Sequence, residues 1–441
     1  MHEIPWENLP RTYQDAVTLA AELEFSFLWV DALCIIQGNK KEWEEQSVLM
    51  GAIYGDATLT ISAANCKAAG NGFLINCGVQ SPLLELIYHP SGSSISTTLY
   101  AGRQYNHSGF ESVESGTLMN IEPTLWNPLR SRAWCFQEYF LSTRILHFSH
   151  DEMLFECKSD ACCQCGMYPF PSLGKTRGMK AKWDARMKSS FSSGSLHSIW
   201  KAIGQDYSTR QLTYFADKLP ALSGLAQSFK DKTGLAYLAG HWDDVDFLIS
   251  LTWRTSGLIL DSSTKSQPTK YQAPSWSWLS LDTLCHIQWA IEPEEKFWNW
   301  TIFLETRILA KTVYPANKTS TGTVVGGYVV VRGCLLEATL DWRANGQLVG
   351  GGYLRRNKKR TEDNEIWLDR LMPDQKKKTV ALWYIGRKGR DGEDFQSHEK
   401  MILEKVVNRT YRRIGWLSQS GKNAHAFVWE YEKFLQTFAI I

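Results

Sequence analysis

The stretch FLWVDALCIIQGNKKEWEEQS, residues 27–47, decides the predicted fold. Its apolar start, residues 27–30, predicts a short buried strand, and an amphipathic helix is predicted over residues 41–53. Asp31 comes directly after the predicted strand. In parallel α/β sheets the functional crevice lies beyond the carboxyl ends of the strands, so Asp31 is a candidate site residue. The competing interpretation is a buried carboxylate that caps the next turn.

The neighbouring segments repeat an alternation of helices and strands. Residues 11–24 place apolar side chains on one helical face, and residues 59–64 (LTISAA) predict a second strand. The order helix, strand, helix, strand indicates an α/β domain with a parallel sheet and flanking helices. We therefore expect such a domain over residues 1–165, interrupted by a long insertion at about 80–127.

The rest of the chain has a different character. A helix is predicted over residues 130–141, followed by two strands, ILHF and MLFEC, around a polar turn. Residues 166–299 predict a helical and loop region, with its helical part at 196–227. Residues 300–441 predict a β-rich, mainly antiparallel accessory region.

The composition is that of an ordinary globular chain. Among 441 residues, 48 Lys and Arg balance 46 Asp and Glu, and the net charge of +2 favours no nucleic-acid partner. The N-terminus, MHEIPWENLP, has no basic start and no apolar core, so no signal peptide is expected. No apolar stretch reaches membrane-spanning length, and the ten cysteines are read as reduced thiols. We expect a cytoplasmic protein with no membrane partner.

Seven blocks of the sequence resemble those of a known family, in the family's order. They are LPRTYQDAV (9–17), FLWVDALCIIQ (27–37), EWEEQSVLMGAIYGDATLTISAA (42–64), RSRAWCFQEYFLSTRILHF (130–148), DKLPALSGLA (217–226), APSWSWLS (273–280) and YRRIG (411–415). By these blocks the chain is similar to the fungal heterokaryon-incompatibility (HET) family over most of its length. The resemblance implies an α/β fold like that of Toll/interleukin-receptor-like (TIR) domains, with a flavodoxin-like parallel sheet.

The resemblance also implies a function. HET proteins are associated with regulated cell death after fusion of unlike fungal cells. Several TIR-like domains cleave NAD with a glutamate, and related chemistry is suspected of HET domains. The positions that match the two most characteristic blocks are Asp31, Cys34, Trp43, Arg132, Trp134, Gln137 and Glu138.

Two departures from the family pattern affect this expectation. The family usually has a strand of the LSYVWG kind ahead of the LP segment, and here that strand is expected to be absent or replaced. Gln46 stands three positions after Trp43, where the family usually has an acidic residue. Glutamine keeps the shape of glutamate but cannot act as a carboxylate base. The ancestral reaction is therefore not expected of this chain.

Glu138 is the leading acid–base candidate. Trp134 and Glu138, four positions apart, share one helical face. A carboxylate beside an indole loses solvation, which would raise its pKa toward the range of a general acid. The competing interpretation is a structural bridge between Arg132 and Glu138. His147 is a second candidate for proton transfer, although a histidine satisfied by backbone bonds is the alternative.

Two further clusters have a structural and a functional interpretation. Four cysteines crowd into ECKSDACCQCG, residues 156–166, without a second C-x-x-C pair at zinc-finger distance. This spacing favours a thiol-rich loop, and no metal site is predicted. Trp276 and Trp278, placed on one strand face, either line an aromatic ligand pocket or form core between domains. Cys34 is expected to be a packed thiol rather than a nucleophile.

The sequence lacks the motifs G-x-G-x-x-G, Walker A, H-E-x-x-H and G-x-S-x-G, so no cofactor is expected. The remaining chemistry is proton transfer, as in cyclisation, dehydration or isomerisation within an apolar pocket. We therefore predict a small-molecule enzyme of fungal secondary metabolism. Its predicted catalytic residues are Asp31, Glu138 and His147, and its predicted substrate-binding residues are Cys34, Trp43, Gln46, Arg132, Trp134, Gln137 and Trp276.

Two other functions stay open at this point. The first is a cell-death effector that acts through self-association or through loss of NAD. The second is a catalytically inactive binding module, in which Asp31, Arg132 and Glu138 are structural. The expected partner is a small-molecule substrate, with formation of a homo-oligomer left open.

Overall fold

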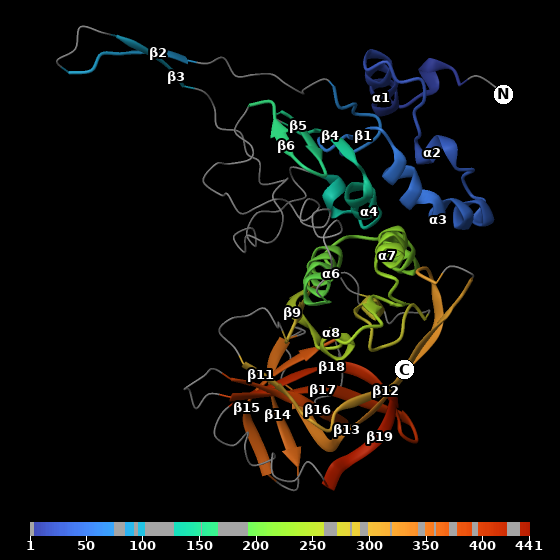
Figure 1. Ribbon diagram of the computed structural model, residues 1–441, viewed down its shortest axis with the longest axis vertical. Coiled ribbons are helices and arrows are strands. Elements are labelled where there is room, and N and C mark those ends of the chain that lie inside the picture. The colour runs from blue at the N-terminus through green and yellow to red at the C-terminus, as the bar shows by residue number, and fades with distance from the viewer. Residues whose placement is uncertain are drawn as a thin grey trace. The chain divides into compact units, whose positions relative to one another are not determined.

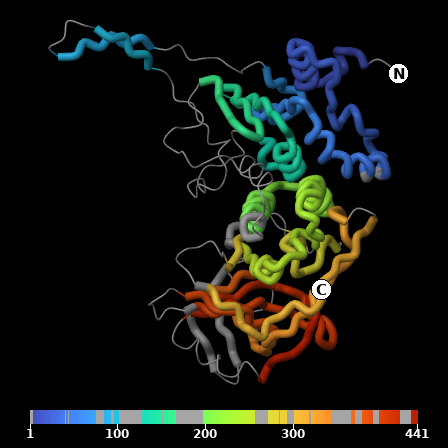
Figure 2. The backbone as a smooth tube through the Cα atoms, in the orientation of Figure 1, coloured from blue at the N-terminus to red at the C-terminus, as the bar shows by residue number. Residues whose placement is uncertain are grey.

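The computed structural model comprises two compact units, Met1–Lys188 and Ser189–Ile441, which are described separately (Figures 1 and 2). The residues that the structure describes are 4–74, 84–91, 96–101, 128–150, 152–165, 193–259, 271–282, 285–291, 299–317, 320–342, 349–356, 359–369, 377–389, 396–420 and 433–441. Among them, no helix is both long and apolar enough to cross a membrane. The predicted division into three regions stays a prediction.

The first unit combines helices with short strands. Its helical elements are η1 (Trp6–Asn8), α1 (Arg11–Glu22), α2 (Asp31–Cys34), α3 (Lys40–Asp56), η5 (Pro128–Ser131) and α4 (Trp134–Leu141). Its strands are β1 (Thr60–Ser62), β2 (Leu84–Tyr88), β3 (Thr97–Ala101), β4 (Arg144–Phe148), β5 (Met153–Cys157) and β6 (Ala161–Cys163). Strands β2 and β3 form a hairpin within the predicted insertion.

The sheet of the first unit is mixed. Its strand order is β1-β4-β5-β6, and β1 runs parallel to β4 with Thr60 opposite Ile145. The pairs β4–β5 and β5–β6 are antiparallel, so the described sheet contains one parallel pair. The α/β class is therefore confirmed. The finer expectation, a parallel sheet of the flavodoxin kind, is not what these four strands form.

The predicted strand at residues 27–30 is wrong. This segment pairs with no strand among the described residues, and the side chain of Phe27 is 95% exposed. Asp31 is thus the first residue of the short helix α2, not the end of a strand. A run of four apolar residues satisfies the local preference for a strand, but a strand forms only where a partner offers its backbone groups.

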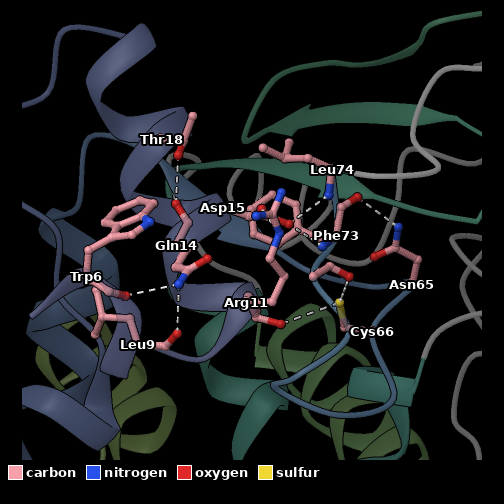
Figure 3. A network of polar contacts seen from close by, with 12 residues as sticks. Trp6, Leu9, Arg11, Gln14, Asp15, Thr18, Asn65, Cys66, Phe73 and Leu74 are labelled. Atoms are coloured by element: carbon pink, nitrogen blue, oxygen red, sulfur yellow. Dashed lines mark hydrogen bonds and ion pairs between the residues drawn. The ribbon is translucent and has the colours of Figure 1, made fainter.

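The buried carboxylate of Asp15 holds α1 to the loop that follows β1, as Figure 3 shows. Asp15 Oδ2 accepts hydrogen bonds from the backbone N–H groups of Phe73 (2.7 Å) and Leu74 (3.1 Å). Its other oxygen forms an ion pair with Arg11 Nε at 3.1 Å. Gly72 precedes these donors with a φ of +71°, a conformation that side chains with a Cβ rarely adopt. The turn depends on glycine for this reason.

We expect Gly72→Ala to destabilise this corner, by about 1–3 kcal/mol. A Cβ at position 72 would lie 2.7 Å from both Arg11 Cγ and Asp15 Oδ2, in addition to the backbone strain. Gly70→Ala is the matched control, because a Cβ there meets nothing within 4 Å. Hydrogen exchange at the amides of Phe73 and Leu74 measures the effect. Equal exchange in the two variants would contradict this account.

The second unit begins with helices and ends in a large sheet. Its helical elements are α6 (Ser193–Tyr207), η7 (Phe215–Asp217), α7 (Pro220–Thr233), α8 (Phe247–Ser250) and η8 (Trp278–Ser280). Its strands are β7 (Tyr237–Leu238), β8 (His241–Trp242), β9 (Trp253–Ile259), β10 (Cys285–Trp289), β11 (Asn299–Ile302), β12 (Arg307–Pro315), β13 (Val324–Trp342), β14 (Val349–Arg356), β15 (Lys359–Leu368), β16 (Lys377–Gly389), β17 (Gln396–Val407), β18 (Thr410–Ser420) and β19 (Leu435–Ile440). The helical segment predicted at 196–227 therefore contains most of α6, the short helix η7 and the first part of α7.

Strands β11 to β19 form one nine-stranded sheet in the order β11-β16-β17-β18-β15-β14-β13-β12, with β19 beside β13 and β18. All neighbouring pairs are antiparallel except β18–β19. The β-rich character predicted after residue 300 is confirmed. Trp276, Trp383 and Trp416 are fully buried in the apolar cluster of this unit.

The predicted strand that would carry Trp276 and Trp278 is not formed. Trp278 opens the short helix η8, and Trp276 lies in the turn before it. Both side chains are completely buried. Trp253 Nε1 donates to the carbonyl of Trp276 at 2.8 Å, so the turn is fixed by indole contacts. The tryptophans of APSWSWLS are therefore core residues of this unit.

Arg413 on β18 ties three strands of the second unit together. Its Nε donates to Asp369, which follows β15, at 3.0 Å. Its terminal nitrogens donate to the carbonyls of Leu251 (2.8 Å) and Trp253, at the start of β9. The guanidinium also stacks over the ring of Trp253, 3.4 Å from its centroid. A planar group with five donors can satisfy all these partners inside a core, whereas an ammonium cannot.

We expect Arg413→Leu to lower the stability of this unit by about 3–5 kcal/mol, because Asp369 would be left as a buried charge without its cation. Arg412→Leu is the matched control, since Arg412 is the exposed neighbour on the same strand. Tryptophan fluorescence during denaturant unfolding reports the change, because Trp253, Trp383 and Trp416 are fully buried here. Equal unfolding midpoints for the two variants would refute the role given to Arg413.

Candidate functional site

The candidate site of the first unit is built on the contact between α3 and α4. Helix α3 begins after Asn39, whose side chain accepts a hydrogen bond from the backbone N–H of Glu42 at 3.2 Å. The indoles of Trp43 on α3 and Trp134 on α4 meet edge to face, with centroids 5.8 Å apart. This aromatic contact sets the two helices beside each other. The two family blocks that the sequence analysis singled out therefore meet through their tryptophans.

The end of α4 is fixed to the sheet. The Ser142 hydroxyl donates to the carbonyl of Glu138 at 2.6 Å, and it lies 2.7 Å from the hydroxyl of Thr60 on β1. Thr143, next in the chain, donates from its hydroxyl to the carbonyl of Gly55 at the end of α3. These contacts hold the turn of α4 that carries Glu138, so its carboxyl group has a defined position.

Glu138 is the most strongly perturbed carboxyl group of this cluster. Burial raises its pKa from the usual 4.5 to about 7. Hydrogen bonds from Cys135 and Tyr54 and the positive charge of Arg132 lower the pKa, whereas the negative charge of Asp31 raises it. Desolvation prevails over the favourable contacts. A carboxyl group with a pKa near 7 can both accept and donate a proton at neutral pH.

Tyr54 completes the cluster from the last turn of α3. Burial raises the pKa of its hydroxyl, and the nearby Glu138 and Asp31 raise it further. The hydroxyl therefore stays protonated and acts as a hydrogen-bond donor toward Glu138. Its ring packs edge to face against Trp29, with centroids 5.8 Å apart.

Asp31 reaches this cluster from the start of α2. Its Oδ1 accepts a hydrogen bond from the backbone N–H of Ala32 at 2.7 Å, and the side chain is exposed. The negative charge of Asp31 raises the pKa of Glu138, although no strand end carries Asp31. Asp31 therefore accepts a hydrogen bond in the first turn of α2 and also acts on Glu138 through its negative charge. Cys34, at the end of α2, is exposed.

His147 belongs to a second polar group. It lies buried on β4, and its Nε2 is 3.4 Å from Glu156 Oε2 on β5. The Tyr139 hydroxyl donates to the other oxygen of Glu156 at 2.9 Å. Glu138 and Tyr139 are adjacent in α4, so their side chains point about 100° apart. Helix α4 therefore presents one polar cluster on each of two faces.

The other predicted residues take varied positions. Gln46 is partly buried and lies on the same helical face as Trp43, Met50 and Tyr54, at spacings of three and four residues. Gln137 on α4 is completely buried. Trp276 belongs to the second unit and is part of its core.

Sequence reasoning missed Tyr54 and Cys135 as members of the cluster. The signal for Tyr54 was the recurrence of Trp43, Gln46, Met50 and Tyr54 along one face of α3. Cys135 lies three residues before Glu138, within one turn of the same helix. Spacings of three and four within each helix would have pointed to both residues. The pairing between the two helices could not be read from spacing.

The raised pKa of Glu138 predicts a distinct pH dependence of stability. The pKa is about 7 in the folded chain and near 4.5 in the unfolded one, so the folded state binds this proton more tightly. Its stabilising contribution is complete below about pH 4.5 and is lost as the pH rises through about 7. The variant Glu138→Gln, fixed in a neutral form, should therefore gain thermal stability relative to the native chain as the pH rises.

Thermal unfolding of native chain and variant at pH 5, 6, 7 and 8 checks this prediction. Glu22→Gln is the control, because Glu22 is exposed at the end of α1. Its difference from the native chain should not vary across this range. A constant difference for Glu138→Gln as well would show that Glu138 keeps an ordinary pKa.

A family match covers the part of the chain that carries the Glu138 cluster. Residues 1–138 match the family model described as heterokaryon incompatibility protein (HET). The match includes Asp31, Tyr54 and Glu138, and the three family-like blocks after residue 200 lie beyond it. Comparisons with curated proteins and with solved structures returned no match. Residues 1–138 of this chain are therefore similar to the heterokaryon-incompatibility (HET) family.

Proposed function

We propose that the first unit is an enzyme that moves a proton on a small-molecule substrate, with Glu138 as its acid–base group. The observation that carries this proposal is the pKa of about 7 that burial gives to Glu138. Perturbed carboxyl groups of this kind are common at catalytic centres, because proton transfer needs a pKa near the working pH. Neither cofactor nor metal is required for such a step.

The neighbours of Glu138 suggest the roles around it. Tyr54 orients the carboxyl group by donating its single O–H to it. Asp31, exposed beside the cluster, marks the side from which a substrate would arrive. Trp43 and Trp134 supply an aromatic wall. Cyclisation, dehydration and isomerisation are the reactions that such groups can catalyse without a cofactor. His147 remains a candidate for a second proton-transfer group.

We keep as a second candidate function a cell-death effector with a TIR-like fold that cleaves NAD or signals. The match of residues 1–138 to the HET family supports its role in heterokaryon incompatibility. In this alternative the glutamate needed for NAD cleavage would stand at position 46, where this chain has glutamine. Gln46 occupies the α3 face that also carries Trp43 and Tyr54. A carboxylate at this position would therefore lie along the same face as the cluster.

The first test compares small-molecule extracts of the source organism after incubation with the native chain or with Glu138→Gln. We expect the native chain to convert at least one compound into an isomer or a product that has lost one water. The variant should be at least about 100-fold slower, the usual contribution of a general acid or base. Glu22→Gln serves as the control and should keep the native rate. Conversion that is equal with Glu138→Gln would contradict the assignment of Glu138.

The second test incubates the native chain and Gln46→Glu with NAD. Under the proposal the native chain leaves NAD intact, because position 46 lacks a carboxylate. Consumption of NAD by the native chain would overturn the proposal in favour of the effector function. Consumption by Gln46→Glu alone would show that an NAD site persists and that one residue disables it.

A further inference from the structure

A second group of reactive side chains lies at one end of the β5–β6 hairpin, away from Glu138 in the sequence. The sulfurs of Cys163 and Cys165 are 3.0 Å apart. These two sulfurs and a carboxylate oxygen of Glu152 all lie within 4.8 Å of one another. The backbone N–H of Cys165 donates to Glu152 Oε2 at 3.0 Å. Glu152 is 3% exposed and Cys163 is 9% exposed. Two thiols and a carboxyl group therefore meet in a sheltered place.

The register of the hairpin explains this meeting. Cys163 on β6 pairs with Leu154 on β5, so the two side chains share one face of the sheet. Side chains alternate along extended backbone, and Glu152 and Cys165 are each two residues farther toward the same end. Cys162 pairs with Phe155 and points to the opposite face. The backbone of Glu152 is held in turn by Ser149, whose hydroxyl accepts from its N–H at 3.2 Å.

We propose that Glu152, Cys163 and Cys165 bind a zinc ion. Thiolate sulfur and carboxylate oxygen are both zinc ligands, at about 2.3 Å and 2.0–2.2 Å. In a tetrahedral site these bonds place two sulfurs about 3.8 Å apart, so the pair would open by less than 1 Å. Three protein ligands leave the fourth position to water or to another donor. Soft sulfur ligands favour zinc over magnesium or calcium.

The carboxyl group decides between a metal and a disulfide. A disulfide would use the two sulfurs and leave Glu152 without a part in the bond. A divalent cation uses all three donors and balances the negative charges that meet where water is scarce. It would also hold β6, a strand of three residues at the edge of the described sheet, to β5. The expected role is therefore structural.

The test measures metal bound to the full chain. Purified without chelator and given one equivalent of zinc, the native chain should retain about one equivalent after gel filtration. Cys163→Ser and Cys165→Ser should lose it, and Glu152→Gln should bind at least about tenfold more weakly. Cys162→Ser is the matched control, because its thiol is exposed on the opposite face, and it should bind like the native chain. Retention by all four variants would overturn the assignment.

A second test uses the native chain alone and so does not depend on whether any variant folds. Alkylation followed by peptide mass analysis, with and without zinc, should show protection of Cys163 and Cys165 and none of Cys162. Cobalt in place of zinc should add the absorption band of sulfur-to-metal charge transfer. Equal alkylation of all three thiols in the presence of zinc would refute the site. A Cys163–Cys165 disulfide that persists under mild reduction with zinc present would refute it as well.

Discussion

The first unit depends on the desolvation of one partly buried carboxyl group, that of Glu138, where two helices meet. Glu138 stands on α4 where that helix meets α3, and the Tyr54 hydroxyl and the Cys135 thiol are its hydrogen-bond partners. Burying a carboxylate in such a place is costly, so the group holds its proton up to about pH 7. The contact of Trp43 with Trp134 and the bond between Ser142 and Thr60 maintain the packing that causes this burial. Helix packing and acid–base chemistry are thus two consequences of a single contact.

The sequence predicts the elements that have strong local signals. Helices α1 and α3, strand β1 and the hairpin β4–β5 lie where their patterns place them, because each buries one face with the proper period. The strand expected at residues 27–30 fails, since local preference says nothing about a pairing partner. The parallel sheet fails for the same reason: three short strands after α4 return as antiparallel neighbours. Propensity selects the conformation of a segment, and contacts between segments select the sheet.

The candidate site was predictable only in part, for a related reason. The spacing of Trp134 and Glu138 on α4 predicts a desolvated carboxyl group, and burial does raise the pKa of Glu138. The partner that matters most across the helix interface is Tyr54, which is distant in sequence. In the same way, the cysteines of residues 157–165 do not suggest a metal until the hairpin brings Glu152 to them. Sequence spacing identifies side chains that share a face of one helix or strand, whereas a functional site usually combines side chains from two or three such elements.

The strand order of the first unit links the Glu138 turn and the proposed zinc site to different strands of the sheet. The Glu138 turn is bonded to Thr60 on β1, at one edge, whereas Cys163 lies on β6, at the other edge. Neighbouring strands lie about 4.8 Å apart, so three strand spacings place about 14 Å between these edges. A cation bound at Cys163 would polarise a substrate directly only by coordinating it at about 2 Å. A metal in the hairpin would therefore act on the stability of β5 and β6. The proton transfer proposed for Glu138 therefore rests on the raised pKa of that residue, whose largest cause is desolvation.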